Sequence, residues 1–266
     1  MAKQEILHIT SVQNTRVKGW AALLEKKHRD RTGCFLVEGV HLVQEALARG
    51  VELECIVYDV VRGWPEELAP LSEGVEQVAA SRQIMSRCTG TDTPPPVFGV
   101  ARKQQPDRSS LYKPQSLVVV LDGVQDPGNV GTIIRSADAV HADAVVLGRG
   151  CVDPYNPKTV RSTMGSLFHL PVIEGDLLEL LPEARRHGIR LTGTSVQAEE
   201  TCYSRDWSAA TWLVMGSESR GLSSEVQELL DDTVRIPMRG NSESLNVAMA
   251  TTVLLYEALR QREYNG

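Results

Sequence analysis

Short runs of hydrophobic residues alternate with longer segments of helical periodicity in the second half of the chain. The runs predict strands at residues 117–121, 144–147, 190–196, 212–216 and 233–237. The segments with apolar positions three and four residues apart predict helices at residues 129–140, 157–167, 177–187, 223–230 and 245–262. This alternation is typical of a parallel sheet covered by helices on both faces, so we expect an α/β fold.

The first part of the chain shows the same alternation less regularly. The expected elements are a helix at residues 14–29, a strand at 34–37, a helix at 40–49 and a strand at 53–58. Residues 91–116 are rich in proline and polar side chains, and the second half of this segment has the composition of a linker. We therefore expect a small α/β domain at residues 1–104, a linker at 105–115 and a larger domain at 116–266.

Composition excludes several other classes of protein. The longest aliphatic run, residues 117–121, is too short to cross a bilayer, and no N-terminal stretch resembles a signal peptide. The 5 cysteines include no C-x-x-C pair, and the 6 histidines lack the H-x-x-H and H-x-x-x-H spacings of zinc ligands. We expect a cytoplasmic protein with no membrane partner, no metal and no disulfide framework.

The charge distribution is more informative than the formal net charge of -6, which argues against a protein that wraps duplex nucleic acid. Residues 1–31 contain seven Lys or Arg side chains against three Asp or Glu side chains. A solvated helix face and an RNA-binding surface both explain this excess. Salt-dependent binding to RNA would separate them, because phosphate contacts release counterions.

The first of three polar turns follows the expected strand at residues 117–121. Its glycines at 123 and 128 have P-loop spacing, but Asn129 and Val130 stand where that motif has Lys-Ser/Thr, and no Rossmann G-x-G-x-x-G is present. These failures count against a nucleoside-triphosphate or nicotinamide enzyme. On the helix that follows, Arg135 shares a face with Gly131 and Asp138, so it either faces a substrate or pairs with Asp138 at the surface.

The second and third turns follow the last two expected strands. Gly216 comes directly after a buried strand, as glycines do where backbone approaches a ligand, and Glu218 lies in the same turn. Residues 236–250 contain a strand end, a polar turn and a helix start, with Ser244 and Asn246 near the helix start. Helix capping explains each turn alone, with Ser242 and Ser244 as the candidate caps of the last helix. Because all three turns fall at the same end of one sheet, we expect a binding site there.

Together the three turns resemble the motifs of the SpoU/TrmH family of S-adenosylmethionine-dependent RNA ribose 2′-O-methyltransferases, in the SPOUT superfamily. The similar segments are residues 129–139, 215–222 and 236–248, and the likeness extends over residues 117–262. Residues 9–14, 17–18 and 35–39 also resemble the substrate-binding module often fused to this domain. Residues 94–98 depart from the more usual Pro-Gly step of that module.

The resemblance implies a C-terminal trefoil knot, an exception to the rule that chains do not thread loops. It implies a homodimer formed through the helices at 129–140 and 245–262. It also implies that the methyl donor, S-adenosylmethionine, binds in the knot at Thr192, Gly193, Thr194, Gly216, Ile236, Met238 and Leu245. The catalytic residues implied are Arg135, Asn129, Glu218, Ser244 and Asn246.

The expected substrate is RNA, with 23S-type ribosomal RNA favoured by the two-domain layout and the N-terminal likeness. A transfer RNA 2′-O-methyltransferase is the first alternative. A non-catalytic RNA-binding or ribosome-assembly protein of the same fold is the second, because function depends on sites rather than on folds. Transfer of a labelled methyl group to RNA separates the enzyme from the binding protein.

Overall fold

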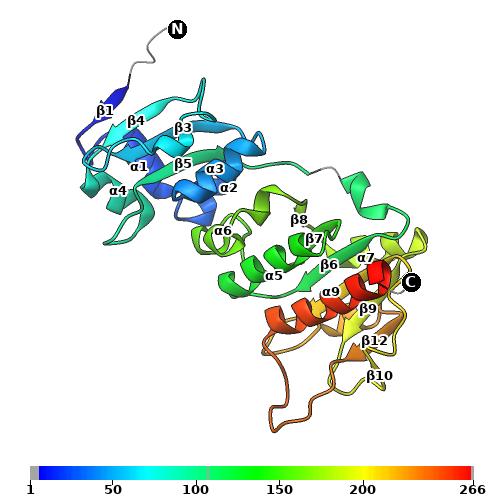
Figure 1. Ribbon diagram of the computed structural model, residues 1–266. Coiled ribbons are helices and arrows are strands. Elements are labelled where there is room, and N and C mark those ends of the chain that lie inside the picture. The colour runs from blue at the N-terminus through cyan, green and yellow to red at the C-terminus, as the bar shows by residue number, and fades with distance from the viewer. Residues whose placement is uncertain (1–5, 107, 265–266) are drawn as a thin grey trace. The chain divides into compact units, whose positions relative to one another are not determined.

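The computed structural model describes residues 6–106 and 108–264. Contacts divide the chain into two compact units, whose elements are labelled in Figure 1. Unit 1 contains the chain up to Gln105 together with Asp153–Phe168. Unit 2 contains Pro106–Val152 and the chain from His169 onwards. Each unit is built on a sheet of its own.

The sheet of unit 1 has five strands within the described residues. Their order is β1 (Leu7–Ile9), β4 (Gln77–Ala80), β3 (Leu53–Asp59), β5 (Val97–Arg102) and β2 (Cys34–Glu38). β1 and β3 run parallel to β4, whereas β5 is antiparallel to both β3 and β2. The carboxyl ends of β1, β2, β3 and β4 therefore point to the same edge of this sheet.

The helices of unit 1 differ from the expected pattern near the N-terminus. Up to Gln105 they are α1 (Thr15–Ala22), α2 (Lys26–Thr32), α3 (Val40–Ala48) and α4 (Arg82–Thr89), with a 3₁₀ helix η1 (Glu66–Leu68). The single helix expected at residues 14–29 is wrong, because the chain breaks between α1 and α2. Arg29 Nη1 donates to the carbonyls of Leu23 and Leu24 at 2.7 and 2.9 Å, which satisfies carbonyls left open at the end of α1.

Asp153–Phe168 belongs to unit 1, although the expected boundaries placed it in the second domain. It contains α6 (Pro157–Thr163) and a 3₁₀ helix η3 (Ser166–Phe168). The rings of Tyr155 and Phe35 lie 4.7 Å apart between centroids, and α6 packs against β2. Asp153 forms a buried ion pair with Arg29, with 2.7 Å between Oδ2 and Nη2. The boundary differs because the partners of this segment lie on α2 and β2.

The helix α6 is shorter than the helix expected at residues 157–167. The side chain of Asn156 caps its start by accepting from Lys158 N–H at 2.9 Å, and Pro157 occupies the first turn. Met164 and Gly165 then adopt positive φ values of 52° and 101°. These left-handed conformations end the helix before residue 167.

The sheet of unit 2 confirms the predicted parallel α/β fold. Its described strands lie in the order β10 (Glu200–Thr201), β12 (Asp232–Arg235), β9 (Arg190–Thr194), β11 (Thr211–Gly216), β6 (Leu117–Asp122), β7 (Ala144–Leu147) and β8 (Val172–Glu174). Every neighbouring pair in this order is parallel. β8 and β10 are too short to have been expected from hydrophobic runs.

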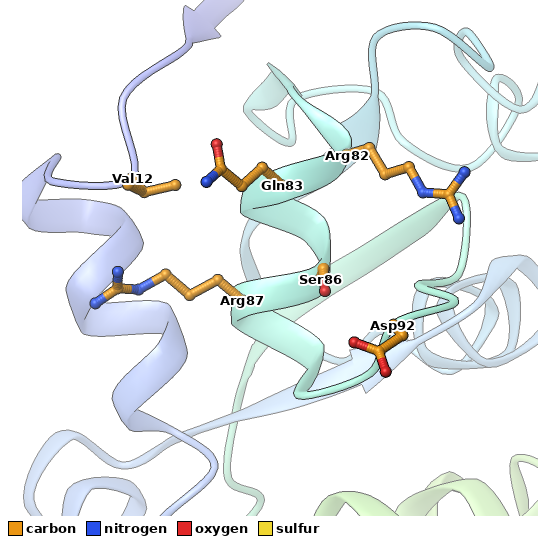
Figure 2. A pocket seen from close by; sticks show the side chains of 6 residues that line it. All are labelled: Val12, Arg82, Gln83, Ser86, Arg87 and Asp92. Atoms are coloured by element: carbon orange, nitrogen blue, oxygen red, sulfur yellow. The ribbon is translucent and has the colours of Figure 1, made fainter.

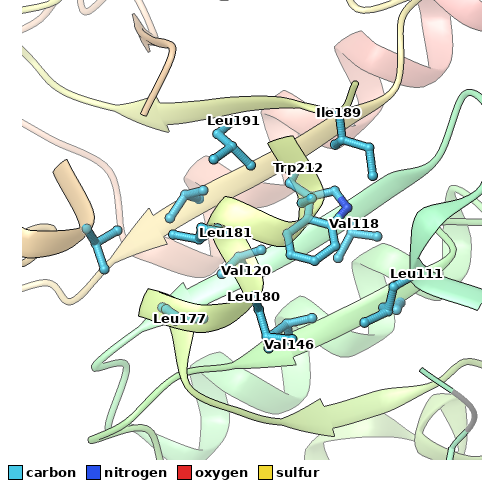
Figure 3. Packing of buried hydrophobic residues seen from close by; sticks show 14 of the residues in the cluster. Leu111, Val118, Val120, Val146, Leu177, Leu180, Leu181, Ile189, Leu191 and Trp212 are labelled. Atoms are coloured by element: carbon cyan, nitrogen blue, oxygen red, sulfur yellow. The ribbon is translucent and has the colours of Figure 1, made fainter. Parts of the chain in front are cut away.

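Helices cover both faces of this sheet. The helices of unit 2 are α5 (Pro127–Ala139), α7 (Leu177–Arg186), α8 (Ser224–Gln227) and α9 (Val247–Tyr264). On one face Val118, Val120 and Trp212 pack with Leu180 and Leu181 of α7 in a buried cluster (Figure 3). α5 and α9 pack on each other, with 2.7 Å between the hydroxyls of Ser136 and Thr252.

The segment expected to be a plain linker, residues 105–115, contains a 3₁₀ helix, η2 (Arg108–Tyr112). Leu111 is fully buried in the core of unit 2. The ring of Tyr112 stacks on Trp212 with 5.8 Å between centroids. Part of the linker is therefore a structural piece of unit 2, held by apolar side chains among its polar residues.

Candidate functional site

The three motif-bearing turns meet at the carboxyl edge of the unit 2 sheet. β6 and β11 are neighbours in register, with Leu121 beside Met215 and Asp122 beside Gly216. From β6 the chain continues to β7 and β8 on one side, whereas from β11 it continues to β12 on the other. Ligands of open α/β sheets bind at such a reversal of strand order. The carboxyl ends of β6 and β11 therefore define the candidate site.

Asn129 is placed by the start of α5. Asp126 caps this helix, because its Oδ1 accepts from Asn129 N–H at 2.9 Å, and Pro127 occupies the first turn. The helix thus begins two residues before the expected start at 129. Within the first turn the Asn129 side chain is free of capping and extends toward the other two turns.

Asn129, Glu218 and Asn246 form one hydrogen-bonded cluster. Asn246 Nδ2 donates to Glu218 Oε1 at 2.9 Å and to Asn129 Oδ1 at 3.1 Å, and Asn129 Nδ2 donates to Glu218 Oε1. All three residues are exposed or half-buried. One residue from each expected motif therefore contributes to a single polar cluster, which we call the motif triad.

Asn246 also caps α9, the role that the sequence assigned to Ser242 or Ser244. Its Oδ1 accepts from Ala248 N–H at 3.0 Å and from Met249 N–H at 3.3 Å. Ser242 Oγ instead donates to the carbonyl of Ser244 at 2.9 Å. The serine caps were thus wrong, because α9 starts at Val247 rather than at residue 245. Ser244 is exposed and makes no side-chain contact with the triad among the described residues.

Arg135 lies apart from the triad on α5. It is six residues beyond Asn129, which corresponds to roughly 9 Å along the helix axis. The alternative pairing with Asp138 is wrong, because Asp138 Oδ2 pairs with His169 Nδ1 at 2.8 Å. Arg135 is exposed and forms no hydrogen bond or ion pair with any described residue. Its guanidinium is available to an external anion.

A cavity of about 380 Å³ adjoins the triad at this edge. The residues that line it are Asp122, Gly123, Gln125, Asp126, Arg149, Gly150, Ser217, Glu218, Ser219, Arg220, Gly221 and Ser223. The sequence interpretation missed Arg149, which follows β7 and pairs with Asp176 at 2.7 Å between Nη2 and Oδ2. The signal was available, since Gly148, Arg149 and Gly150 follow a buried strand of the same sheet.

Cys151, beside this cavity, is not a nucleophile. Burial raises the pKa of its thiol to about 11, and Sγ donates to the carbonyl of Leu121 at 3.2 Å. A thiol of that pKa is protonated at neutral pH. The described residues contain no group of three or more His, Cys, Asp or Glu side chains that could hold a metal, and none of their helices has the length and apolarity of a membrane span.

Two of the three expected donor-binding residues on β9, Thr192 and Gly193, pack within the core of unit 2. Thr192 is fully buried, and its Oγ1 accepts from Arg205 Nη2 at 2.6 Å. A Cβ at Gly193 would overlap the terminal methyl group of Leu230, so a larger residue there would require Leu230 to move. Thr194 pairs in register with Val234 and is half-buried. The Thr192 side chain is therefore occupied and Gly193 has none, so at these two positions only backbone groups could contact a donor.

Gly216 is required by the chain itself. A Cβ at this position would overlap the backbone of Gly221 and Leu222. The reason is a tight turn in which Ser217 and Gly221 exchange two backbone hydrogen bonds of 3.0 and 2.8 Å. The sequence indicated that the backbone at Gly216 closely approaches another group. In this structure that group is the backbone of the following turn rather than a ligand.

The loop at residues 236–246 carries the remaining donor-binding candidates. Ile236 and Met238 are half-buried, and Leu245 is 39% exposed. Within the described part of the chain, no backbone N–H of residues 236–246 has a hydrogen-bond acceptor. Half-buried apolar side chains beside open backbone donors suit a ligand with an apolar ring and polar edges. This loop therefore fits an adenosine-containing donor.

The fold and the site together define an α/β enzyme with a ligand crevice at a strand-order reversal. A model of the SpoU rRNA Methylase family matches residues 116–256, and a model of the MRM3-like substrate binding domain matches residues 14–99. The chain belongs to the SpoU rRNA methylase family, as its motifs predicted. The matched segment runs through residues 153–168, which pack in unit 1.

Characterised relatives support this assignment over nearly the full chain. The 23S rRNA (guanosine(2553)-2′-O)-methyltransferase RlmP of Bacillus subtilis is 38% identical over 93% of this chain and 97% of its own. The SpoU methyltransferase AviRb of Streptomyces viridochromogenes, in complex with AdoMet, has a TM-score of 0.88 at 36% identity, covering 96% and 100% of the two chains. An AdoMet-bound rRNA methyltransferase from Sinorhizobium meliloti has a TM-score of 0.85 at 33% identity, covering 98% and 99%.

Proposed function

We propose that this protein transfers a methyl group from S-adenosylmethionine to a ribose 2′-hydroxyl of large-subunit ribosomal RNA. The observation that carries the proposal is the motif triad, which joins one residue from each family motif at the crevice. Relatives named as 23S rRNA 2′-O-methyltransferases cover almost the whole chain, including the substrate-binding unit. Two relatives that match over nearly the full chain, from Bacillus subtilis and Streptomyces viridochromogenes, are named as 23S rRNA methyltransferases, which favours ribosomal RNA over the transfer RNA alternative.

The donor supplies an electrophilic methyl group on a positively charged sulfur. The chain would hold it through backbone groups of Thr192, Gly193, Thr194 and Gly216 and through the loop that carries Ile236, Met238 and Leu245. The open N–H groups and half-buried apolar side chains of that loop support this assignment. The enzyme then has to align the 2′ oxygen with the methyl carbon, and positioning supplies much of such a rate enhancement.

Arg135 and the triad have separate tasks in this proposal. Arginine stays protonated, so Arg135 stabilises the negative charge that develops on the 2′ oxygen or orients a neighbouring phosphate. Asn129, Glu218 and Asn246 fix the ribose and the three turns, while Ser244 closes the loop over the donor. The proton of the 2′-hydroxyl leaves to a water or to an RNA phosphate.

The active form is a homodimer in this proposal, because Arg135 makes no hydrogen bond or ion pair with the triad of its own chain and lies roughly 9 Å from Asn129 along the axis of α5. Met249 and Tyr256 on α9 are each 50% exposed, and their spacing of seven residues places them on one helix face. A second copy seated on α5 and α9 covers that face and brings its Arg135 to the triad. The trefoil knot implied by the family stays a prediction. The protein works in the cytoplasm, where ribosomal RNA is modified.

The function is tested by transfer of a radiolabelled methyl group from the donor to deproteinised 23S rRNA, 16S rRNA and transfer RNA in parallel. We expect label in 23S rRNA, at a nucleotide that loses its 2′-O-methyl group in cells lacking the gene. Label in transfer RNA alone would identify transfer RNA, rather than ribosomal RNA, as the substrate. If the protein binds the donor and RNA but transfers no methyl group, the non-catalytic RNA-binding alternative would be supported.

Complementation tests the shared site. Arg135→Ala and Asn246→Asp variants are each expected to be inactive, but their mixed dimer contains one site with both native residues. Mixing and re-equilibrating the two variants should therefore restore up to about a quarter of wild-type activity. No recovery, with heterodimers shown by mass spectrometry, would place Arg135 in the site of its own chain.

A further inference from the structure

A second cavity lies in unit 1, away from every motif that the proposed function uses. Its volume is about 560 Å³, within the range of roughly 300–1,000 Å³ typical of ligand sites. It is lined by Val12, Arg82, Gln83, Ser86, Arg87 and Asp92. Four of these residues come from α4, and Val12 lies in the segment at residues 9–14 that resembles the substrate-binding module.

The topology of unit 1 brings these residues together. The parallel strands β1 and β4 end at Ile9 and Ala80, at the same edge of the sheet. The loop that contains Val12 follows β1, and α4 follows β4. Ser86 Oγ donates to the carbonyl of Thr91 at 2.6 Å, which ties the loop that carries Asp92 to the helix. The cavity is thus formed on a rigid helix and on loops at the carboxyl edge of the sheet.

Arg82 and Arg87 differ from several other arginines of unit 1, which are paired with carboxylates. Arg16 pairs with Glu76, Arg29 with Asp153, and Arg161 with Glu38. Within the described residues Arg82 and Arg87 are exposed and have no carboxylate within ion-pair distance. An unpaired guanidinium beside a cavity is suited to bidentate binding of phosphate.

The cavity has two chemically different sides. Figure 2 shows Gln83 extending from α4 toward Val12 and Arg87 extending to the same side, whereas Arg82 and Asp92 lie toward the opposite edge of the cavity. The side with Arg87 and Gln83 presents a cation and an amide without a carboxylate. The side with Arg82 and Asp92 presents both a donor and an acceptor, which suits a ribose hydroxyl or the polar edge of a base.

From this arrangement we infer that the cavity binds one unpaired nucleotide of the substrate RNA, with its phosphate on Arg87 and its nucleoside between Arg82 and Asp92. RNA is recognised mainly at loops and bulges, where unstacked bases are accessible. The inference rests on the proposed function, because it assumes an RNA substrate. It adds a second recognition point in unit 1 to the ribose site of unit 2.

The test measures binding of the full chain to deproteinised 23S rRNA as a function of salt. The double variant Arg82→Ala/Arg87→Ala should raise Kd about tenfold and lower the slope of log K against log salt by about 1 to 2, as expected for lost phosphate contacts. The matched control Arg49→Ala/Arg62→Ala removes two exposed charges of unit 1 that lie outside the cavity and outside residues 1–31. It should change both quantities much less.

Single variants test the phosphate-binding side and the nucleoside-binding side of the cavity separately. Arg87→Ala should account for most of the slope change, whereas Asp92→Ala should leave the slope and reduce the preference for RNA over DNA of the same sequence. Calorimetry of donor binding should give the wild-type affinity for all of these variants, and thermal unfolding should show that unit 1 of each variant remains folded. In methyl transfer the double variant should raise KM for RNA with little change in kcat.

An unchanged Kd and slope in the double variant, or equal losses in the double variant and the control, would overturn the cavity assignment. Methyl transfer by the wild type would survive that result, so the proposed function would stand. Conversely, a wild type that binds 23S rRNA through Arg82 and Arg87 but transfers no methyl group would reject the function and keep the site.

Discussion

The buried pair of Arg29 and Asp153 in unit 1 and the motif triad in unit 2 both join residues that are far apart in the sequence. The pair is 2% and 5% exposed, and Arg29 also donates to two backbone carbonyls. The triad is open to solvent at the edge of a cavity. The hydrogen bonds of the pair thus stabilise the fold, whereas the exposed groups of the triad remain accessible to a ligand.

This comparison indicates that the burial of a polar cluster determines whether the cluster mainly affects stability or the reaction. A buried charge without its partner costs several kcal/mol, so substitutions in the pair should act on stability. An exposed cluster is hydrated when a partner is lost, so substitutions in the triad should act on the reaction. Substitutions at Asp153 and Asn246 test this division directly, and substitutions at Arg135 and Gly216 extend it to the rest of the candidate site. They follow from the largest expected effect to the smallest.

Asp153→Ala should lower the stability of unit 1 by about 3–5 kcal/mol, because it leaves the Arg29 guanidinium buried without its carboxylate. Chemical denaturation monitored by tryptophan fluorescence measures this change. The matched double variant Arg29→Met/Asp153→Leu should recover much of the loss, because neither charge then remains. A decrease in the free energy of unfolding below about 1 kcal/mol in the single variant would show that the pair is hydrated. The pair and the triad would then not differ in the way proposed.

Arg135→Ala should lower kcat for methyl transfer about 10²- to 10³-fold, as for other groups that stabilise developing charge. Its unfolding midpoint should not change, because Arg135 has no partner among the described residues of its chain. Single-turnover kinetics with labelled donor, beside calorimetry of donor binding, measure the two effects separately. Normal turnover would remove Arg135 from the catalytic residues.

Gly216→Ala should destabilise unit 2 by about 1–3 kcal/mol, since the new methyl group overlaps the backbone of the next turn. Gly240→Ala is the matched control for stability, because its Cβ meets nothing within 4 Å. Both variants are compared by thermal unfolding and by donor affinity. A Gly216 variant of native stability that fails to bind the donor would show that the glycine serves the ligand rather than the turn.

Asn246→Ala should cost about 1 kcal/mol of stability through the lost cap of α9. Asn246→Asp keeps the capping oxygen, so it should recover this stability. It should nevertheless lack activity, because it removes both Nδ2 donors and adds a carboxylate beside Glu218. Activity in the aspartate variant close to wild type would return Asn246 to a purely structural role.

The fold of unit 2 was predictable because β6, β7 and β11 are mainly hydrophobic runs and α5 and α7 carry apolar residues at helical spacing. The break between α1 and α2 was not, because it depends on Arg29 reaching carbonyls that are five and six residues earlier in the chain. Short strands such as β8 have too few residues to show a pattern. Periodicity describes local burial, and these features depend on individual tertiary contacts.

The candidate site was predictable to the level of its three turns. Parallel strands place their carboxyl ends together, so Asn129, Glu218 and Asn246 could be expected to converge from motif order alone. Arg149 was missed because its turn is short and outside the motifs. The role of Asn246 as the cap of α9 was assigned to serines, since Ser is as good a cap as Asn and only the structure fixes where the helix starts.

The placement of Asp153–Phe168 means that the chain passes between the two units three times, after Gln105, Val152 and Phe168. No single cut can release both units complete. A protease that cleaves between the units near residue 105 leaves an N-terminal fragment without Asp153, Tyr155 and Phe168, so the apolar surface of Phe35 and the charge of Arg29 become exposed to solvent. The substrate-binding unit is therefore not a module that can be transplanted by its contiguous sequence.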